Sequence, residues 1–157
     1  MLSTGIQLAA LGAALAALLA GIGSAYGVHV SGKAAAGVLS EQPELFGKII
    51  VLQALPGTQG VYGFITGIIV LITSGIFGGT AEAMTVQQGW QYFIACLPIA
   101  FGGLFSAIYQ GHVAASAIHL TAKQPDSSSR GITLTAVVET YAILALLISI
   151  VLIFSVG

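Results

Sequence analysis

Residues 49–77 read IIVLQALPGTQGVYGFITGIIVLITSGIF. This run is long enough for a helix to cross a lipid bilayer, which takes about 20 apolar residues. Polar or helix-breaking side chains nevertheless lie near its middle, at Pro56, Thr58, Gln59 and Tyr62. The segment therefore predicts a membrane helix whose polar residues need a functional explanation.

The composition of the whole chain also indicates a membrane protein. Of its 157 residues, 57% are hydrophobic and 6% are charged, whereas soluble domains carry roughly 25% charged residues. The net charge of −1 gives no basis for a nucleic-acid partner or for a polybasic membrane anchor. We expect an all-α integral membrane protein that contacts lipid and binds no nucleic acid.

Four apolar segments are joined by short polar connections. The segments span residues 6–30, 47–77, 89–120 and 131–154. An even number of segments with short connections predicts four antiparallel transmembrane helices, arranged as helical hairpins.

The charged residues of the connections predict the orientation of the chain. The basic residues all fall at the first and third connections: Lys33, Lys48, Lys123 and Arg130. The middle connection carries only Glu82. By the positive-inside rule, the first and third connections lie in the cytoplasm and both termini lie outside. We therefore predict a multi-pass protein of the cell membrane.

The chain contains an internal repeat. A shift of 82 residues aligns several pairs without a gap: Gln42-Pro43 with Gln124-Pro125, Ser24-Ala25 with Ser106-Ala107, and Lys48 with Arg130. We expect a single membrane domain of two tandem hairpins, about residues 1–78 and about residues 79–157. The repeats differ in chemistry, because Glu139 of the second falls on Gly57 of the first.

The first and third segments carry a small residue at every fourth position. These stripes are Ala9, Ala13, Ala17, Gly21 and Ala25, and Gly103, Ala107, Gly111 and Ala115. Such stripes let membrane helices pack closely. They fit either packing inside one four-helix bundle or an inner circle of helices in a ring of identical chains. Their place on alternate helices favours the homo-oligomeric ring, with the second and fourth helices outside.

Polar residues of the second segment lie on one helix face. Leu55, Thr58, Gln59 and Tyr62 follow the spacing i, i+3, i+4, i+7. Pro56 lacks a backbone donor and opens the helix locally, which frees a carbonyl group. The stretch therefore predicts a polar stripe beside a loosened backbone.

Glu139 lies at the same depth in the fourth segment. At 1.5 Å per residue it is about 13 Å beyond Arg130, and Thr58 is about 15 Å beyond Lys48. An ionised carboxylate at this depth costs roughly 3 kcal/mol on insertion scales. No lysine or arginine lies at that level. The compensating charge must therefore be a proton or a bound cation.

Gln110 in the third segment supplies a further amide group. Counted from Lys123 it is about 20 Å deep, so it is level with Glu139 only if the third helix projects past the membrane, which we expect. Together the carboxylate, the Thr58 hydroxyl, the two amide oxygens and a freed carbonyl would form an oxygen cage. Oxygen ligands suit a hard cation rather than a transition metal.

These motifs resemble a known family. LPGTQGVYGF at residues 55–64, YQG at 109–111 and VVETYAIL at 137–144 are similar to the proteolipid rotor-ring subunit of V-type ATPases, nearest to its duplicated, sodium-carrying bacterial form. The resemblance spans nearly the whole chain. It implies a closed ring of identical subunits that turns against a stator membrane subunit. Central-stalk subunits would contact the cytoplasmic loops, and ATP would be hydrolysed in a separate soluble headpiece.

The resemblance also implies the ion-binding residues. The sodium ligands of the family fall on the Leu55 carbonyl, Thr58, Gln59, Gln110 and Glu139. Tyr62 matches the residue that hydrogen-bonds the carboxylate.

Two alternatives remain for the cargo and the function. A rotor that carries H+ needs only the carboxyl group, and Thr58, Gln59 and Gln110 would then each cost about 1–3 kcal/mol if unpaired; sodium uses all three and is favoured. A small proton-coupled multidrug exporter is more distant, since its acid usually lies in the first helix. The chain has no phosphate-binding loop, so we expect no bound nucleotide and no catalysis by this subunit alone.

Overall fold

The computed structural model describes residues 3–78 and 84–156, so Glu82 lies outside the described residues. Within these ranges the chain forms α-helices and 3₁₀ turns, and no strand is present. In chain order the elements are α1 Thr4–Glu41, η1 Pro43–Leu45, α2 Phe46–Ala54, η2 Leu55–Gly57, α3 Thr58–Thr73, α4 Val86–Lys123, η3 Pro125–Ser127 and α5 Ser128–Phe154.

In the described part of the chain, four helical rods are long and apolar enough to cross a membrane. They are Thr4–Glu41, Pro43–Thr73, Val86–Lys123 and Pro125–Phe154, with mean hydropathy between 1.5 and 2.5. The second rod joins α2, η2 and α3. The predicted number and order of transmembrane helices are therefore confirmed.

The predicted end of the first helix is wrong, because α1 continues past residue 30 to Glu41. The third helix, α4, extends three residues beyond the predicted segment at each end and finishes at Lys123. The first and third connections are thus tight turns that begin at Gln42 and Gln124. Hydropathy identifies the stretch that suits lipid, but a helix continues into water until a residue ends it, here Pro43 and Pro125.

Both long helices exceed the hydrocarbon thickness of a bilayer. Each has 38 residues, which at 1.5 Å per residue is about 57 Å. The hydrocarbon core measures about 30 Å. Part of α1 and part of α4 must therefore project beyond it.

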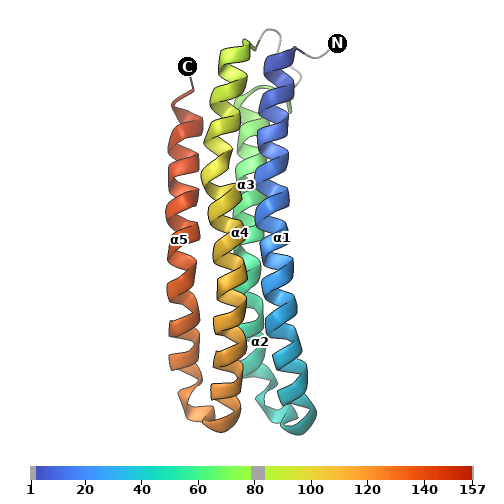
Figure 1. Cartoon of the computed structure of the whole chain (residues 1–157), viewed down its shortest axis with the longest axis vertical. Coiled ribbons are helices and arrows are strands. Elements are labelled where there is room, and N and C mark those ends of the chain that lie inside the picture. Colours follow the sequence, from blue (N-terminus) through green and yellow to red (C-terminus); the bar gives the residue numbers. More distant parts are fainter. Residues whose placement is uncertain (1–2, 79–83, 157) are drawn as a thin grey trace.

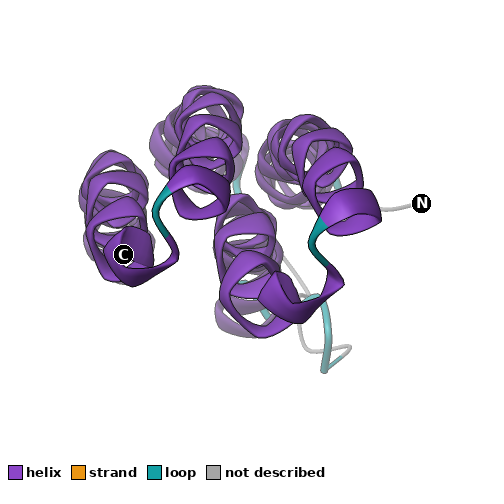
Figure 2. Cartoon of the chain, turned by 90° about the horizontal axis from the view of Figure 1, so that it is seen from below, coloured by secondary structure: helices purple, strands orange, loops and turns teal. Residues whose placement is uncertain are grey.

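The rods pack as antiparallel hairpins. Both chain ends lie at one end of the molecule, and both proline turns lie at the other (Figure 1). Seen along the rods, α4 lies between α1 and α5, and the α2–α3 rod packs into the angle below α1 and α4 (Figure 2). At the turn end, Lys48 Nζ of α2 donates to the Pro125 carbonyl of η3 at 2.9 Å, which links the first hairpin to the second.

Small residues hold α1 and α4 together. A Cβ atom added to Gly23 would lie 2.5 Å from the Leu104 carbonyl oxygen, and one added to Gly103 would lie 2.8 Å from Ala20 Cβ. At Gly111 the added atom would overlap the Gly27 backbone. The two helices can approach so closely only because these positions lack side chains.

This contact corrects the interpretation of the small stripes. Within the third-segment stripe, Gly103, Ala107 and Gly111 are buried inside the chain. Ala9 and Ala13 are buried as well, but the rest of the α1 stripe, Ala17, Gly21 and Ala25, is partly or fully exposed. A four-residue repeat drifts around a helix of 3.6 residues per turn, so one stripe reaches two different surfaces.

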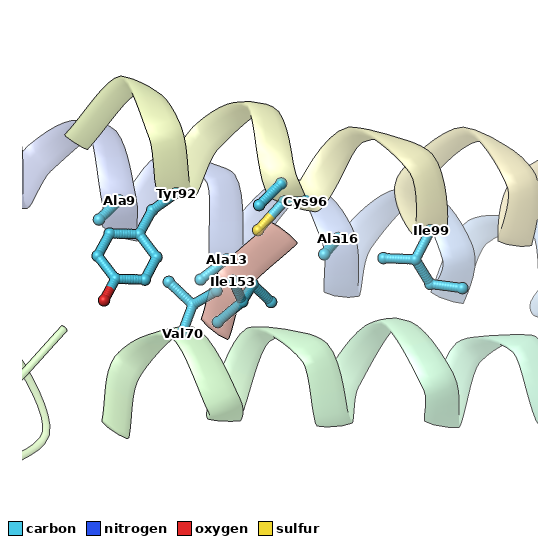
Figure 3. Packing of buried hydrophobic residues seen from close by; sticks show 9 residues of the cluster. Ala9, Ala13, Ala16, Val70, Tyr92, Cys96, Ile99 and Ile153 are labelled. Carbon is cyan, nitrogen blue, oxygen red and sulfur yellow. The ribbon is translucent and has the colours of Figure 1, made fainter. Parts of the chain in front are cut away.

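An apolar cluster joins all four rods near the chain ends (Figure 3). Its labelled members are Ala9, Ala13, Ala16, Val70, Tyr92, Cys96, Ile99 and Ile153. Large apolar side chains on the far sides of α3 and α5 are exposed instead, among them Phe64 and Phe154. Such faces suit contact with lipid.

Candidate functional site

The site begins at a break in the second rod. A single 3₁₀ turn, Leu55–Gly57, separates α2 from α3, because Pro56 has no N–H to continue the α-helical pattern. Gly27 of α1 gives this turn room, since a Cβ at Gly27 would lie 2.7 Å from Pro56 Cβ. The predicted local opening of the helix at Pro56 is present.

Three oxygen atoms gather where α3 starts. The Leu55 carbonyl accepts a hydrogen bond from the Thr58 backbone N–H and another from Thr58 Oγ1 at 3.0 Å. Gln59 Oε1 lies 3.4 Å from the same hydroxyl. The Thr58 hydroxyl thus bonds back to the preceding turn, as lone threonines often do, and Gln59 Oε1 lies beside it as a second acceptor.

The two predicted glutamines meet across the helices. Gln59 Nε2 of α3 donates to Gln110 Oε1 of α4 at 2.5 Å, and both side chains are fully buried. Gln110 Nε2 donates in turn to the Thr135 carbonyl of α5 at 3.1 Å. Gln110 is therefore level with Gln59, and the greater depth counted from Lys123 reflects the length of α4.

Tyr62 and Glu139 complete the group. The Tyr62 hydroxyl donates to Glu139 Oε1 at 2.5 Å, which joins α3 to α5. The Glu139 side chain is 9% exposed, although its neighbours Val137 and Tyr141 are among the most exposed residues of α5. The structure thus pairs Tyr62 with Glu139. One turn earlier on α3, hydrogen bonds join the other predicted residues, which are Leu55, Thr58, Gln59 and Gln110.

Two polar residues of this group were not predicted from the sequence. Ser106 Oγ donates to the Val138 carbonyl at 3.0 Å and lies 3.4 Å from Gln59 Nε2. The second is Thr135, whose carbonyl accepts the hydrogen bond from Gln110 Nε2. The match of Ser24 with Ser106 in the internal repeat was the one sequence signal that pointed to this serine.

The charge of the site limits what it can hold. Glu139 supplies one carboxylate, the other oxygens are neutral, and the basic residues lie toward the turn end of the rods. A proton or a monovalent cation would neutralise this carboxylate, whereas a divalent cation would leave an uncompensated charge in apolar surroundings. Among the described residues, histidine, cysteine and carboxylate side chains form no group of three suited to a metal ion.

Comparison with known proteins gives the same family twice within the chain. Residues 11–70 and residues 93–152 each match the family of the ATP synthase C subunit. The second match begins 82 residues after the first, which is the offset of the internal repeat.

Three relatives illustrate the similarity. The chain is 47% identical over 151 residues to the V-type sodium ATPase K subunit of Enterococcus hirae, which covers 96% of this chain and 93% of the relative. It is 41% identical over 140 residues to the A-type ATP synthase K subunit of Methanocaldococcus jannaschii, covering 89% of this chain and 60% of that longer relative. It is 26% identical over 142 residues to the V-type proton ATPase 16 kDa proteolipid of Rattus norvegicus, covering 90% and 88%.

The duplicated match, the four apolar rods and the buried glutamate between helices agree with one another. The chain belongs to the ATP synthase C-subunit family.

Proposed function

We propose that this chain is the rotor-ring subunit of a V-type ATPase and that it carries Na+ across the membrane at Glu139. The observation that carries the proposal is a buried carboxylate on α5 that accepts from Tyr62 of α3, next to a buried pair of glutamines that joins α3 to α4. The relative in Enterococcus hirae, named for a V-type sodium ATPase, supports the choice of ion.

Sodium binding would use the oxygens already gathered at the site. The Leu55 carbonyl, Thr58 Oγ1, Gln59 Oε1, Gln110 Oε1 and the Glu139 carboxylate replace the hydration shell of the ion. The Tyr62 hydroxyl holds Glu139 by the hydrogen bond to Oε1. One carboxylate and one Na+ sum to no net charge, which lowers the cost of the occupied site in lipid.

Identical copies of the chain would form a closed ring that turns as a body. The site stays occupied while it faces lipid, because an empty ionised carboxylate is costly there. At the stator membrane subunit, a fixed positive charge favours the empty, ionised form and the ion leaves. The driving force comes from ATP hydrolysed by separate soluble subunits, so this chain is a non-catalytic part of the complex.

The orientation of the rods follows from the basic residues. Lys33, Lys48, Lys123 and Arg130 all lie toward the turn end, so this end is placed in the cytoplasm and both termini outside. The turns at Gln42 and Gln124 would then meet the central-stalk subunits. The two family matches at one fixed offset support a single membrane domain of two repeats, about residues 1–78 and 79–157.

Protons are the second candidate cargo for the same rotor. The relative in Rattus norvegicus is named for a proton ATPase, and a proton needs only Glu139. The extra oxygens of Thr58, Gln59 and Gln110 favour sodium, since a hard cation is coordinated by several oxygens whereas a proton needs only the carboxylate. A small multidrug exporter is not supported by the family to which the chain belongs.

Carbodiimide labelling of the purified ring separates the two ions. The reagent modifies a protonated carboxyl group, and a sodium ion at Glu139 keeps the proton away. We expect millimolar sodium to protect Glu139 at neutral or alkaline pH. Labelling that is unaffected by sodium, in a complex that still acidifies vesicles, would assign the chain to proton transport.

A further inference from the structure

We propose that Ser106 is a positioning residue that turns the Gln59 amide oxygen toward the cation and so favours Na+ over H+. This inference rests on the proposed sodium site and adds a residue that determines its selectivity. It follows from counting donors and acceptors around the two buried glutamines.

The orientation of Gln110 is set by a backbone carbonyl. The Thr135 carbonyl only accepts hydrogen bonds, so the Gln110 atom that meets it at 3.1 Å must be Nε2. Gln110 Oε1 then faces Gln59, where it accepts from Nε2.

The orientation of Ser106 is set in the same way. The Val138 carbonyl, 3.0 Å from Ser106 Oγ, requires the single hydroxyl proton of the serine. Ser106 Oγ can therefore only accept from Gln59, so the group that faces it at 3.4 Å is the Gln59 NH₂.

These two acceptors, Gln110 Oε1 and Ser106 Oγ, determine the orientation of the Gln59 amide. Its two N–H groups point to Gln110 Oε1 and to Ser106 Oγ. Its oxygen is left on the side of Thr58 Oγ1, 3.4 Å away. Gln59 thus presents an oxygen to the sodium site, although the amide could otherwise rotate by half a turn.

Ser106 becomes more important when the cation is bound. A bound Na+ draws on the oxygen of Gln110, which then accepts less well from Gln59. Ser106 Oγ is the acceptor that remains for the buried NH₂ group, and a buried donor without an acceptor is costly. Protonation of Glu139 makes no such demand on Gln59, so Ser106 favours the sodium-bound state alone.

The repeat supplies a matched control in Ser24. It aligns with Ser106 at the 82-residue offset and also makes a contact between helices, because its Oγ accepts from the Gly60 backbone N–H at 2.7 Å. Replacing Ser24 therefore removes a hydrogen bond between helices at the equivalent level without removing the acceptor of the Gln59 amide.

The test compares Ser106→Ala, Ser24→Ala and the unchanged chain as purified rings. For each ring, the sodium concentration that halves carbodiimide labelling of Glu139 is measured, together with the pH at half-labelling in the absence of sodium. We expect Ser106→Ala to raise the sodium midpoint about tenfold and to leave the pH midpoint unchanged. Ser24→Ala should leave both unchanged.

A double substitution tests whether Ser106 acts through Gln59. In a Gln59→Leu background, Ser106→Ala should raise the sodium midpoint by less than about twofold, because there is no amide left to orient. Ser106→Thr retains the hydroxyl, so its sodium affinity should be close to that of the unchanged ring. Ser106→Val has the shape of threonine without the hydroxyl, so its sodium affinity should be as low as that of Ser106→Ala. If Ser106→Ala rings fail to assemble, Ser106→Cys, which retains the volume but accepts weakly, takes its place.

Several results would overturn the proposal while leaving the sodium function intact. The first is an unchanged sodium midpoint in Ser106→Ala, or a shift equal to that of Ser24→Ala. The second is a shift of the pH midpoint in Ser106→Ala as large as that of the sodium midpoint. The third is that Ser106→Ala raises the sodium midpoint as much in the Gln59→Leu background as in the unchanged chain. Absence of sodium protection in the unchanged ring would instead contradict the proposed function itself.

Discussion

Glu139 carries the charge of the site, and neutral groups supply the remaining oxygens. Its carboxylate accepts from Tyr62, while the Gln59 and Gln110 amides are fully buried and bonded to each other. Such a site is stable in lipid only while a cation or a proton compensates the charge. In the proposed function, transport therefore depends on the charge of Glu139, and ion selectivity depends on the neutral residues around it.

Replacing the charge should stop transport without disturbing the fold. Glu139→Gln retains the size of the side chain and an oxygen that can accept from Tyr62, but it removes the negative charge that binds the ion. We expect ion transport by the reconstituted ATPase to be lost, while the mass of the ring in mild detergent is unchanged. Substantial pumping by this variant would exclude Glu139 from the mechanism.

Sodium binding should weaken as the pH falls. In the proposed site, protons and sodium compete for the Glu139 carboxylate, so a protonated site would not hold the ion. Once the carboxyl group is mostly protonated, the sodium midpoint should rise about tenfold for each further pH unit. Titrations of carbodiimide protection at several pH values measure this slope, and a midpoint independent of pH across that range would exclude the competition.

The sequence predicted the chemically distinctive residues of the site, but not the residue that hydrogen-bonds and orients one of them. Pro56, the spacing from Leu55 to Tyr62 and the lone Glu139 stand out against an apolar background. Ser106 does not, because a serine in a membrane helix usually bonds back to its own backbone. Its contact with Gln59 depends on how α3, α4 and α5 are placed around one another, and no pattern within one helix records that placement.

Among the secondary-structure elements, the contact between α1 and α4 positions the site. Glycines at this contact let the two backbones approach. Both α3 and α5 pack against α4, and Gln110 of α4 bonds to Gln59 of α3 and to the Thr135 carbonyl of α5. The small stripes predicted close packing correctly. They did not distinguish packing within the chain from packing between chains, because both use the same residues.

Substitution by alanine should have opposite effects on stability at a glycine packed against another helix and at a glycine with open space around it. At Gly23 the new Cβ would lie 2.5 Å from the Leu104 carbonyl oxygen, whereas at Gly37 nothing lies within 4 Å. Gly23→Ala should lower stability by about 1–3 kcal/mol through overpacking. Gly37→Ala should raise stability by roughly 0.5–1 kcal/mol, since alanine favours helix. Thermal unfolding in mild detergent measures both, and equal effects would contradict the close packing of α1 on α4.

The helix ends show what hydropathy omits. The pattern placed the end of the first segment at residue 30, but α1 runs to Glu41. The sequence KAAAGVL after Ser31 and Gly32 contains good helix formers, so the helix continues in water. Hydropathy measures affinity for lipid and helix propensity measures local structure, and the two coincide only inside the bilayer.

For the whole molecule, the open side of α1 is the surface best suited to meet a second copy. Gly21 is half-buried, and nothing lies within 4 Å of the position of a Cβ at Gly21. Ala17 is also half-buried and Ala25 is exposed on the same helix. In the proposed ring this surface belongs to the inner circle, where small residues allow neighbouring subunits to approach.

Enlarging Gly21 should therefore affect assembly rather than the fold of the chain. Gly21→Leu has free space within one chain but would separate neighbouring subunits. We expect the helical content to be retained and the ring mass, measured by native mass spectrometry in mild detergent, to fall or become heterogeneous. Gly37→Leu is the control at a second open position. A variant ring of unchanged mass would exclude this surface as a contact between subunits.

Sodium binding to the purified ring tests the central claim most directly. The amount of radioactive sodium bound at alkaline pH should rise in proportion to the amount of ring protein. Glu139→Gln should abolish this binding while the ring remains intact. The same unchanged ring in the reconstituted ATPase should move sodium into vesicles when ATP is added. A ring that binds no sodium at neutral or alkaline pH, in a complex that acidifies vesicles, would contradict the account and assign Glu139 to protons.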